Sequence, residues 1–203
     1  MENKTTSESI NQTISAIQTR LAKPKILCGR FDQSKILTGM KKPLASSGRF
    51  CVLADKGILW RTLQPFPNTL RLSRDEIVHL QGDRVAMRLD AKQEPTVRMI
   101  NSVLFSLLSG DLTQLDTLFE VDAKFDSKLD NKLDNKLDNQ NWKVGLKARQ
   151  AALAKAIGQI SLEGNAYVKN IHILEASGDS TSIIFSEIKT GESALTAEEA
   201  ALF

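Results

Sequence analysis

Two cysteines and two histidines are the side chains of this 203-residue chain whose types most often carry chemistry. Cysteine thiols can pair as a disulfide, act as nucleophiles or bind metal, and histidine can bind metal or transfer protons. His79 and His172 each lie within a strand-like stretch, and neither stands at a metal-ligand spacing from a cysteine or a carboxylate. The chain also contains no GxSxG elbow, no P-loop and no GxGxxG fingerprint. We therefore predict a protein that is not an enzyme, with no catalytic residue, no metal site and no cofactor.

The two cysteines leave two alternatives. Cys28 and Cys51 lie in two strand-like segments, on either side of a loop that we place at Thr38 to Ser46. A hairpin centred on that loop does not bring them opposite each other. Because buried cysteine packs as a small apolar residue, we favour free, packed thiols. A disulfide remains the alternative in an oxidising compartment.

The composition indicates a globular protein and gives no overall charge signal for a particular class of partner. Of the residues, 41% are apolar and 25% charged, which is ordinary for one folded domain, and we expect a single domain over residues 1–203. The net charge of +3 is too small and too evenly mixed to indicate nucleic acid or anionic lipid as an electrostatic partner. The sequence contains no run of 18 apolar residues, the length that would be needed to span a membrane.

Most of the chain alternates between apolar and polar residues with the period of a β-strand. The clearest stretch is SGRFCVLADKGILWRTLQPFP, residues 47–67, where two alternating segments are separated by Asp55-Lys56-Gly57. Turn signals separate most of the others, which favours an antiparallel meander that curls into a barrel or half-barrel. The predicted strands are Ile26–Leu37, Gly48–Ala54, Ile58–Leu63, Leu70–Ser73, Glu76–Gln81, Arg84–Asp90, Phe119–Phe125, Trp142–Lys147, Ile157–Leu162, Ala166–Glu175 and Ser180–Lys189.

Helical periodicity interrupts this pattern at the start, in the middle and at the end. Apolar residues from Ile10 to Leu21 repeat at four, three and four, and Pro24 ends that helix. A second apolar stripe runs from Thr96 to Leu108, and shorter helices are predicted at 111–118 and 148–156. Thr196 and Glu199 fit a capping box that opens a C-terminal helix.

The tetrapeptide KLDN occurs three times in succession between Lys128 and Asn139. As a helix this repeat would stack like charges at every fourth residue, and Asp and Asn are poor helix formers. We predict a mobile hairpin tip of low complexity over residues 126–141.

Two segments carry a resemblance to a known family. Gly29, Phe31 and Gln33 in CGRFDQSK, and the ungapped run from Gly48 to Pro65 with Trp60 and Gln64-Pro65, resemble the LolA family of periplasmic lipoprotein carriers. The resemblance implies an α+β fold that is mainly antiparallel: a curved, unclosed β-barrel with helices as a lid or plug on the concave face.

The resemblance also implies a function, in which an apolar cavity binds the acyl chains of a lipoprotein or other lipid. It implies a monomer in the periplasm that moves its load from inner-membrane donor proteins towards outer-membrane acceptor proteins. Such proteins are exported, whereas MENKTTSESINQ lacks the basic and apolar regions of a signal peptide. The resemblance therefore implies that a signal peptide was removed, and a cytoplasmic protein with its natural start remains the alternative. The cavity residues that we expect are Phe31, Phe50, Val52, Ile58, Trp60, Phe66, Val103, Leu104, Leu107 and Leu108.

One position departs from the family pattern. Ala54 stands where the carriers have an arginine that takes part in opening and closing the cavity, so that role does not carry over. The chain therefore resembles divergent members found among genes for aryl polyenes or related lipid pigments, and the load could be a glycolipid or polyene lipid. Periodicity alone equally fits an ordinary closed core, which would indicate an interaction or adaptor protein.

Overall fold

The structure is a computed structural model, and it describes residues 12, 14–82, 84–90, 92, 103, 105, 106, 108, 111, 112, 115–125 and 141–203. Its eleven strands are β1 (Ile26–Ile36), β2 (Leu44–Leu53), β3 (Gly57–Gln64), β4 (Asn68–Leu72), β5 (Glu76–Gln81), β6 (Arg84–Asp90), β7 (Phe119–Phe125), β8 (Trp142–Ala148), β9 (Gln159–Gly164), β10 (Val168–Leu174) and β11 (Ser180–Thr190). Each of the eleven predicted strands is therefore present.

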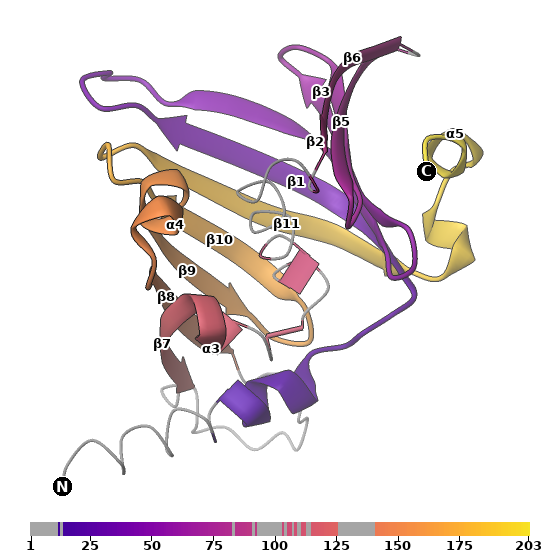
Figure 1. Cartoon of the computed structure of the whole chain (residues 1–203). Helices are drawn as coiled ribbons and strands as arrows, with labels where there is room; N and C mark the ends of the chain where they lie inside the picture. Colours follow the sequence, from indigo (N-terminus) through magenta and orange to yellow (C-terminus); the bar gives the residue numbers. More distant parts are fainter. Residues whose placement is uncertain are drawn as a thin grey trace, which may run out of the picture.

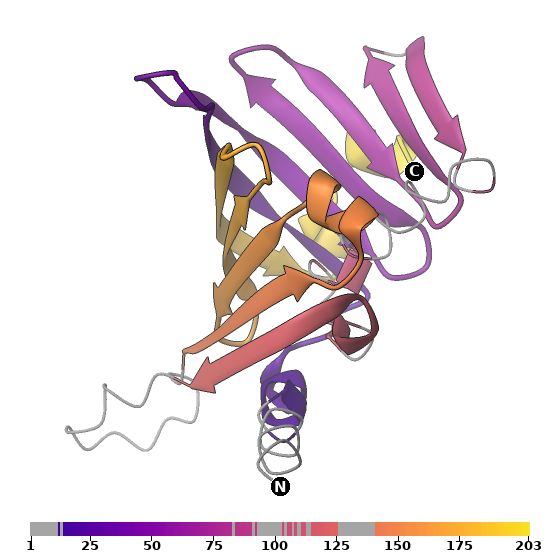
Figure 2. The same cartoon turned by 60° about the vertical axis from the view of Figure 1, so that its left-hand side comes forward.

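The strands form one antiparallel sheet that does not close on itself. The order is β6-β5-β4-β3-β2-β1-β11-β10-β9-β8-β7, so the first strand pairs with the last and the edges are β6 and β7. Figures 1 and 2 show the sheet curving so that its β3–β6 side and its β7–β9 side turn towards each other around the helical segments. The expected antiparallel, unclosed sheet is confirmed.

The β1–β2 hairpin differs from the prediction in its register, because β2 begins at Leu44 and not at Gly48. Lys35 pairs with Leu44, and the connecting loop is correspondingly shorter than the loop expected from Thr38 to Ser46. Continuing this register inward places Cys28 directly opposite Cys51.

The two cysteines form a disulfide, so the prediction of free, packed thiols was wrong. Their Cα atoms lie 4.1 Å apart across the hairpin, and both side chains are buried. The physical reason for the error is the register: strand pairing extends into Leu44–Ser47, a stretch too weakly apolar to be recognised as strand. A one-residue difference in the centre of a hairpin changes every cross-strand partner.

Helical segments and the apolar faces of the strands enclose the main core. Residues 14–20 are helical and bring Ile17 into the core, and Leu21, which follows this helix, also lies there. Val103 belongs to the same core, as does Leu115, the first residue of α3 (Leu115–Leu118). Of the predicted helix from Thr96 to Leu108, the structure describes residues 103, 105, 106 and 108, which are helical. The predicted helix over 111–118 is shorter, since residues 111 and 112 are not helical, and α4 (Ala151–Ala156) begins three residues later than expected. No helix among the described residues is long and apolar enough to cross a membrane.

The other face of the sheet is partly covered by the C-terminal segment. The 3-10 helix η2 (Glu192–Ala194) and α5 (Ala197–Ala201) lie over the disulfide and Leu59, as Figure 1 shows for α5 at the side of the sheet remote from α3 and α4. The Thr196–Glu199 capping box is present as predicted. The KLDN repeats lie outside the described residues. Of the mobile tip predicted over residues 126–141, the structure describes position 141 alone.

Candidate functional site: an apolar cavity at the inner face of the sheet

Four aromatic side chains meet on the inner face of the sheet, where β1, β2, β3 and β11 lie side by side. Phe31 stacks on Trp60 with ring centroids 3.9 Å apart, and Phe50 packs on Phe185 at 4.8 Å. Trp60 lies edge-on to Phe185 at 6.1 Å, which joins the two pairs into one group. The group follows from the register, because Phe50 pairs with Trp60 and Phe31 with Phe185. Such packing is favourable beyond the area that it buries.

Two glycines make room for these rings. Gly29 pairs with Phe50, and Gly48 pairs with Phe31, so each bulky ring has a glycine opposite it on the neighbouring strand. A Cβ atom at Gly29 would lie 2.9 Å from a ring carbon of Phe50 and 2.9 Å from the backbone oxygen of Ser186. The resemblance carried by Gly29 and Gly48 therefore has a local packing reason.

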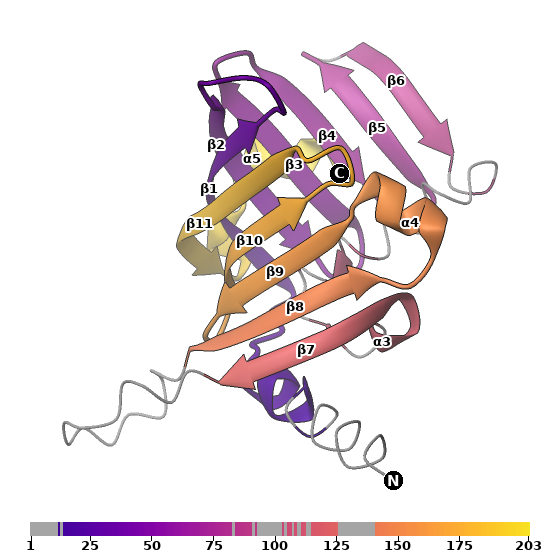
Figure 3. The same ribbon diagram turned by 90° about the vertical axis from the view of Figure 1, so that its left-hand side faces the viewer.

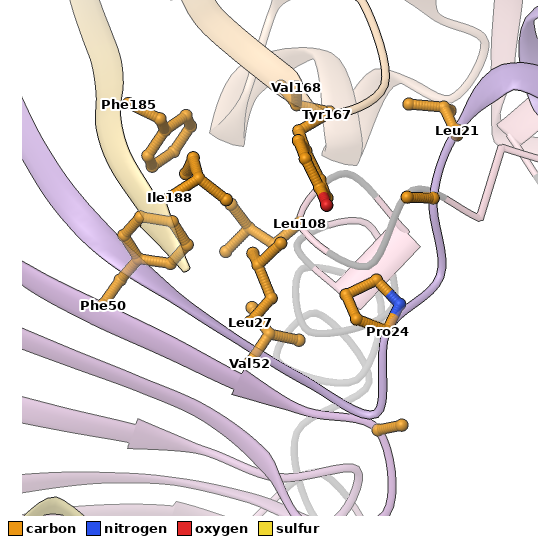
Figure 4. Close-up of a pocket in the computed structure, with 12 residues that line it drawn as sticks. Leu21, Pro24, Leu27, Phe50, Val52, Leu108, Tyr167, Val168, Phe185 and Ile188 are labelled. Atoms are coloured by element: carbon orange, nitrogen blue, oxygen red, sulfur yellow. The ribbon is translucent and has the colours of Figure 1, made fainter. Parts of the chain in front are cut away.

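An apolar cavity of about 40 Å³ adjoins the aromatic group (Figure 4). Phe50 and Phe185 belong to both the group and the cavity wall. In Figure 4, Leu108 lies between these rings and Tyr167, which extends from the opposite side. The wall consists of Leu21, Ala22, Pro24, Leu27, Phe50, Val52, Ala54, Leu108, Tyr167, Val168, Phe185 and Ile188.

Part of this wall is attached to the rest of the molecule through hydrogen bonds outside the sheet ladder. The amide of Ala22 donates to the carbonyl oxygen of Ala166 at 2.8 Å, which holds the N-terminal segment against the β9–β10 turn. The amide of Leu112 donates to Oε1 of Gln18 at 2.7 Å and joins the N-terminal helix to the chain before α3. The hydrogen-bonded strands form one side of the cavity, and the segments before β1 and around Leu108 form the other.

The predicted cavity residues occupy four kinds of place. Phe50, Val52 and Leu108 line the cavity, and Phe31, Ile58, Trp60 and Val103 lie in the core that adjoins it. Phe66 does not join them, because it is 79% exposed in the turn between β3 and β4. Leu104 and Leu107 lie outside the described residues.

The cavity residues that sequence analysis missed come mainly from the two ends of the chain. Phe185 alternates with Ile183 in a predicted strand, but only the pairing of β1 with β11 brings it against Phe31. Leu21 was recognised as part of an apolar helical stripe without its destination. Ala54, the position of the missing arginine, lines the cavity.

Neither histidine lies in the cavity wall. His79 pairs with Leu70 and Met87 across β4–β6. His172 lies on the face of the sheet that points away from the cavity, because its neighbours Ile171 and Ile173 belong to the main core. Its Nδ1 atom is 2.9 Å from the hydroxyl oxygen of Ser182 in an exposed setting. These two positions offer no polar group that converges on an apolar ligand.

A charged group lies buried on the outer face, beneath the C-terminal helix. Glu199 is 1% exposed, and its carboxylate accepts hydrogen bonds from Arg49 at 2.8 Å and from the amide of Thr196 at 3.0 Å. Burial raises the pKa of Glu199, but the bonds from Arg49 and Thr196 outweigh it and hold the pKa below its usual value. The Sγ atom of Cys51 lies 3.6 Å from the same carboxylate. We assign this group to the attachment of the C-terminal segment.

No protein-family model and no curated protein matches the sequence. Among solved structures, the chain is similar to a LolA superfamily protein from Nitrosomonas europaea, with 7% identity over 90% of this chain and 94% of that one and a TM-score of 0.44. It is similar to a putative outer membrane lipoprotein-sorting protein domain from Vibrio parahaemolyticus, with 9% identity, 95% and 96% coverage and a TM-score of 0.46. It is also similar to a DUF1329 family protein from Desulfovibrio piger, with 10% identity, 96% and 99% coverage and a TM-score of 0.48. At these identities the likeness concerns the fold alone.

Proposed function

We propose that this protein is a non-catalytic carrier that holds an apolar chain, such as the acyl chain of a lipoprotein or of another lipid, at the inner face of its open sheet. The observation that carries the proposal is the apolar cavity, which has a strand wall on one side and the N-terminal segment with Leu108 on the other. Burial of an acyl chain there would contribute roughly 0.8 kcal/mol for each CH₂ group. The resemblance to the LolA family in Gly29–Gln33 and Gly48–Pro65 supports the same function.

The cavity as described is too small for an acyl chain. Its volume of about 40 Å³ is far below the roughly 300–1,000 Å³ of ordinary ligand pockets. Loading therefore requires one wall to move. The N-terminal segment and the helical residues near Leu108 are the candidates, because the opposite wall belongs to the hydrogen-bonded sheet. Movement of that wall is a gating step of the kind that lids perform.

The Cys28–Cys51 disulfide supports a location outside the cytoplasm, since disulfides persist in oxidising compartments. As the resemblance to the LolA family implies, we propose a monomer in the periplasm that takes its load from an inner-membrane donor protein and delivers it to an outer-membrane acceptor protein. A glycolipid or polyene lipid fits the same cavity as an alternative load.

Native mass spectrometry of the purified protein, followed by lipid extraction, tests the proposal and identifies the load. In parallel, uptake of a fluorescent apolar probe is compared between two matched variants. Ala54 and Ala45 are both exposed, but only Ala54 lines the cavity. Ala54→Trp therefore places a large ring at the cavity wall, and Ala45→Trp places the same ring on β2 away from that wall. We expect Ala54→Trp to weaken uptake at least about tenfold and Ala45→Trp to leave it unchanged. Absence of bound lipid together with absence of uptake by the wild type would contradict the proposal.

A second candidate is an interaction protein with a filled interior. The observation that favours it is the aromatic group itself, because Phe31, Phe50, Trp60 and Phe185 already fill much of the inner face. This candidate predicts a mass without ligand and equal, negligible uptake in both tryptophan variants.

A further inference from the structure

We propose that the sheet end formed by the β1–β2 and β3–β4 turns contacts the surface of an anionic lipid bilayer. This contact is separate from the cavity, whose wall residues Leu27, Val52 and Val168 lie towards the other end of their strands. The strands run antiparallel, so the two turns end along the same rim of the sheet, at the top of Figure 3. We call this set of residues, 36–44 and 63–67, the turn rim.

Exposed apolar side chains gather at the turn rim. Five of the nine large apolar side chains that are exposed in the described part of the chain belong to it, with exposures of 45–79%. Single exposed apolar residues are normal on a protein surface, but a concentration at one end indicates a surface with a partner. The five residues are Ile36, Met40, Leu44, Leu63 and Phe66.

The charge of the turn rim selects an anionic partner. Lys41 and Lys42 stand between Met40 and Leu44, both are exposed, and within the described residues neither is ion-paired. The two segments of the rim contain no acidic residue, and the Asp179 carboxylate of the adjoining β10–β11 turn accepts a hydrogen bond from the Thr38 amide at 2.7 Å, so the two lysines outnumber the acid that contacts the rim. Lysine next to an apolar side chain suits a membrane interface, where the apolar group enters the acyl boundary and the ammonium group remains among the headgroups.

The surface between the two turns favours a bilayer over a protein. Next to the two turns lies a hollow whose lining is largely polar and includes Asp32, Ser46 and Gln64, together with Ile184 of β11. None of the five exposed apolar side chains of the turn rim lines this hollow, so they do not join into one patch across it. A protein partner with a flat apolar surface would remove water from these polar groups without replacing their hydrogen bonds. A bilayer interface accepts separate projecting side chains and leaves the polar hollow among hydrated headgroups.

Co-sedimentation with phosphatidylcholine vesicles, with and without phosphatidylglycerol, tests this inference on the full chain. Two rim variants are used, Met40→Ser with Phe66→Ser, and Lys41→Ala with Lys42→Ala. Their matched controls are Met87→Ser, which removes an exposed apolar side chain in the middle of β6, and Lys25→Ala with Lys56→Ala, which removes two exposed lysines at the other end of the sheet.

We expect the wild type to bind vesicles that contain phosphatidylglycerol and the lysine rim variant to bind them about 30-fold more weakly. We expect the apolar rim variant to lose at least about tenfold, and both controls to bind as the wild type does. The proposal is overturned if the wild type does not sediment with anionic vesicles, or if the controls lose as much as the rim variants. Unchanged binding by both rim variants would also overturn it and would leave the turn rim to a protein partner.

The cavity gives an independent readout. The rim variants should take up the apolar probe as the wild type does, and Ala54→Trp should keep vesicle binding while it loses uptake. Failure of the carrier function and failure of the membrane contact are therefore distinguishable.

Discussion

Reduction of the Cys28–Cys51 disulfide should lower the free energy of unfolding by about 3.4 kcal/mol at 25 °C. The bond closes a loop between positions 23 residues apart, and the lost chain entropy of a loop of that length gives this value. The value is an upper bound, because a denatured hairpin that retains structure has less entropy to gain. With both cysteines buried, the reductant must reach them through the unfolded state, so the comparison is made at equilibrium.

Guanidinium unfolding, with and without reductant, measures this difference, and a thiol titration in denaturant measures the redox state directly. The variant Cys28→Ala with Cys51→Ala is the control, because reductant should not change its stability. Two reactive thiols in the unreduced, denatured protein from an oxidising compartment would refute the disulfide. Equal stability with and without reductant would refute the magnitude and assign the pair no role in holding the hairpin.

Three further changes test the packing. Gly29→Ala should cost about 1–3 kcal/mol in urea unfolding, because its Cβ would meet Phe50 and backbone; unchanged stability would show that the strand yields. Trp60→Ala should cost about 3–5 kcal/mol by the same measurement, and a loss below about 1 kcal/mol would mean that its ring is not packed as described. Glu199→Gln should cost about 1–2 kcal/mol at pH 7, since it weakens a charged hydrogen bond to a partly exposed Arg49. Because the folded pKa of Glu199 is lowered, its contribution is present above its usual pKa of about 4.5 and is lost as pH falls below that value; a difference between Glu199→Gln and wild type that does not shrink in acid would contradict this.

The strands were predictable because each of them carries its own local signal. Alternation and turn residues located all eleven, and β6 agrees with the prediction at both ends. Helical periodicity likewise located the helix that ends before Pro24, and the Thr196–Glu199 pair identified the cap of α5. Each of these signals lies within a few residues, where local sterics and hydrogen bonding decide the conformation.

The cavity was only partly predictable. Phe50 and Val52 were expected on its wall because they share one face of a strand. Phe66 shares the aromatic character of the others, but it follows Pro65 in a turn, where alternation no longer determines which way a side chain points. Leu21 and Ile188 come from opposite ends of the chain, and no periodicity within either segment indicates that they meet.

The sequence by itself determined where each strand lies along the chain, the order of strands and helices, and that one face of a strand is apolar. Tertiary structure decided the register of β1 against β2, which pairs Cys28 with Cys51, and the pairing of β1 with β11, which brings Phe185 to Phe31. The physical reason is that two strands can form nearly equivalent backbone hydrogen bonds in any register. The choice among registers therefore depends on the side chains of all neighbouring strands together. The site therefore exists only where residues far apart in the sequence share one packed face.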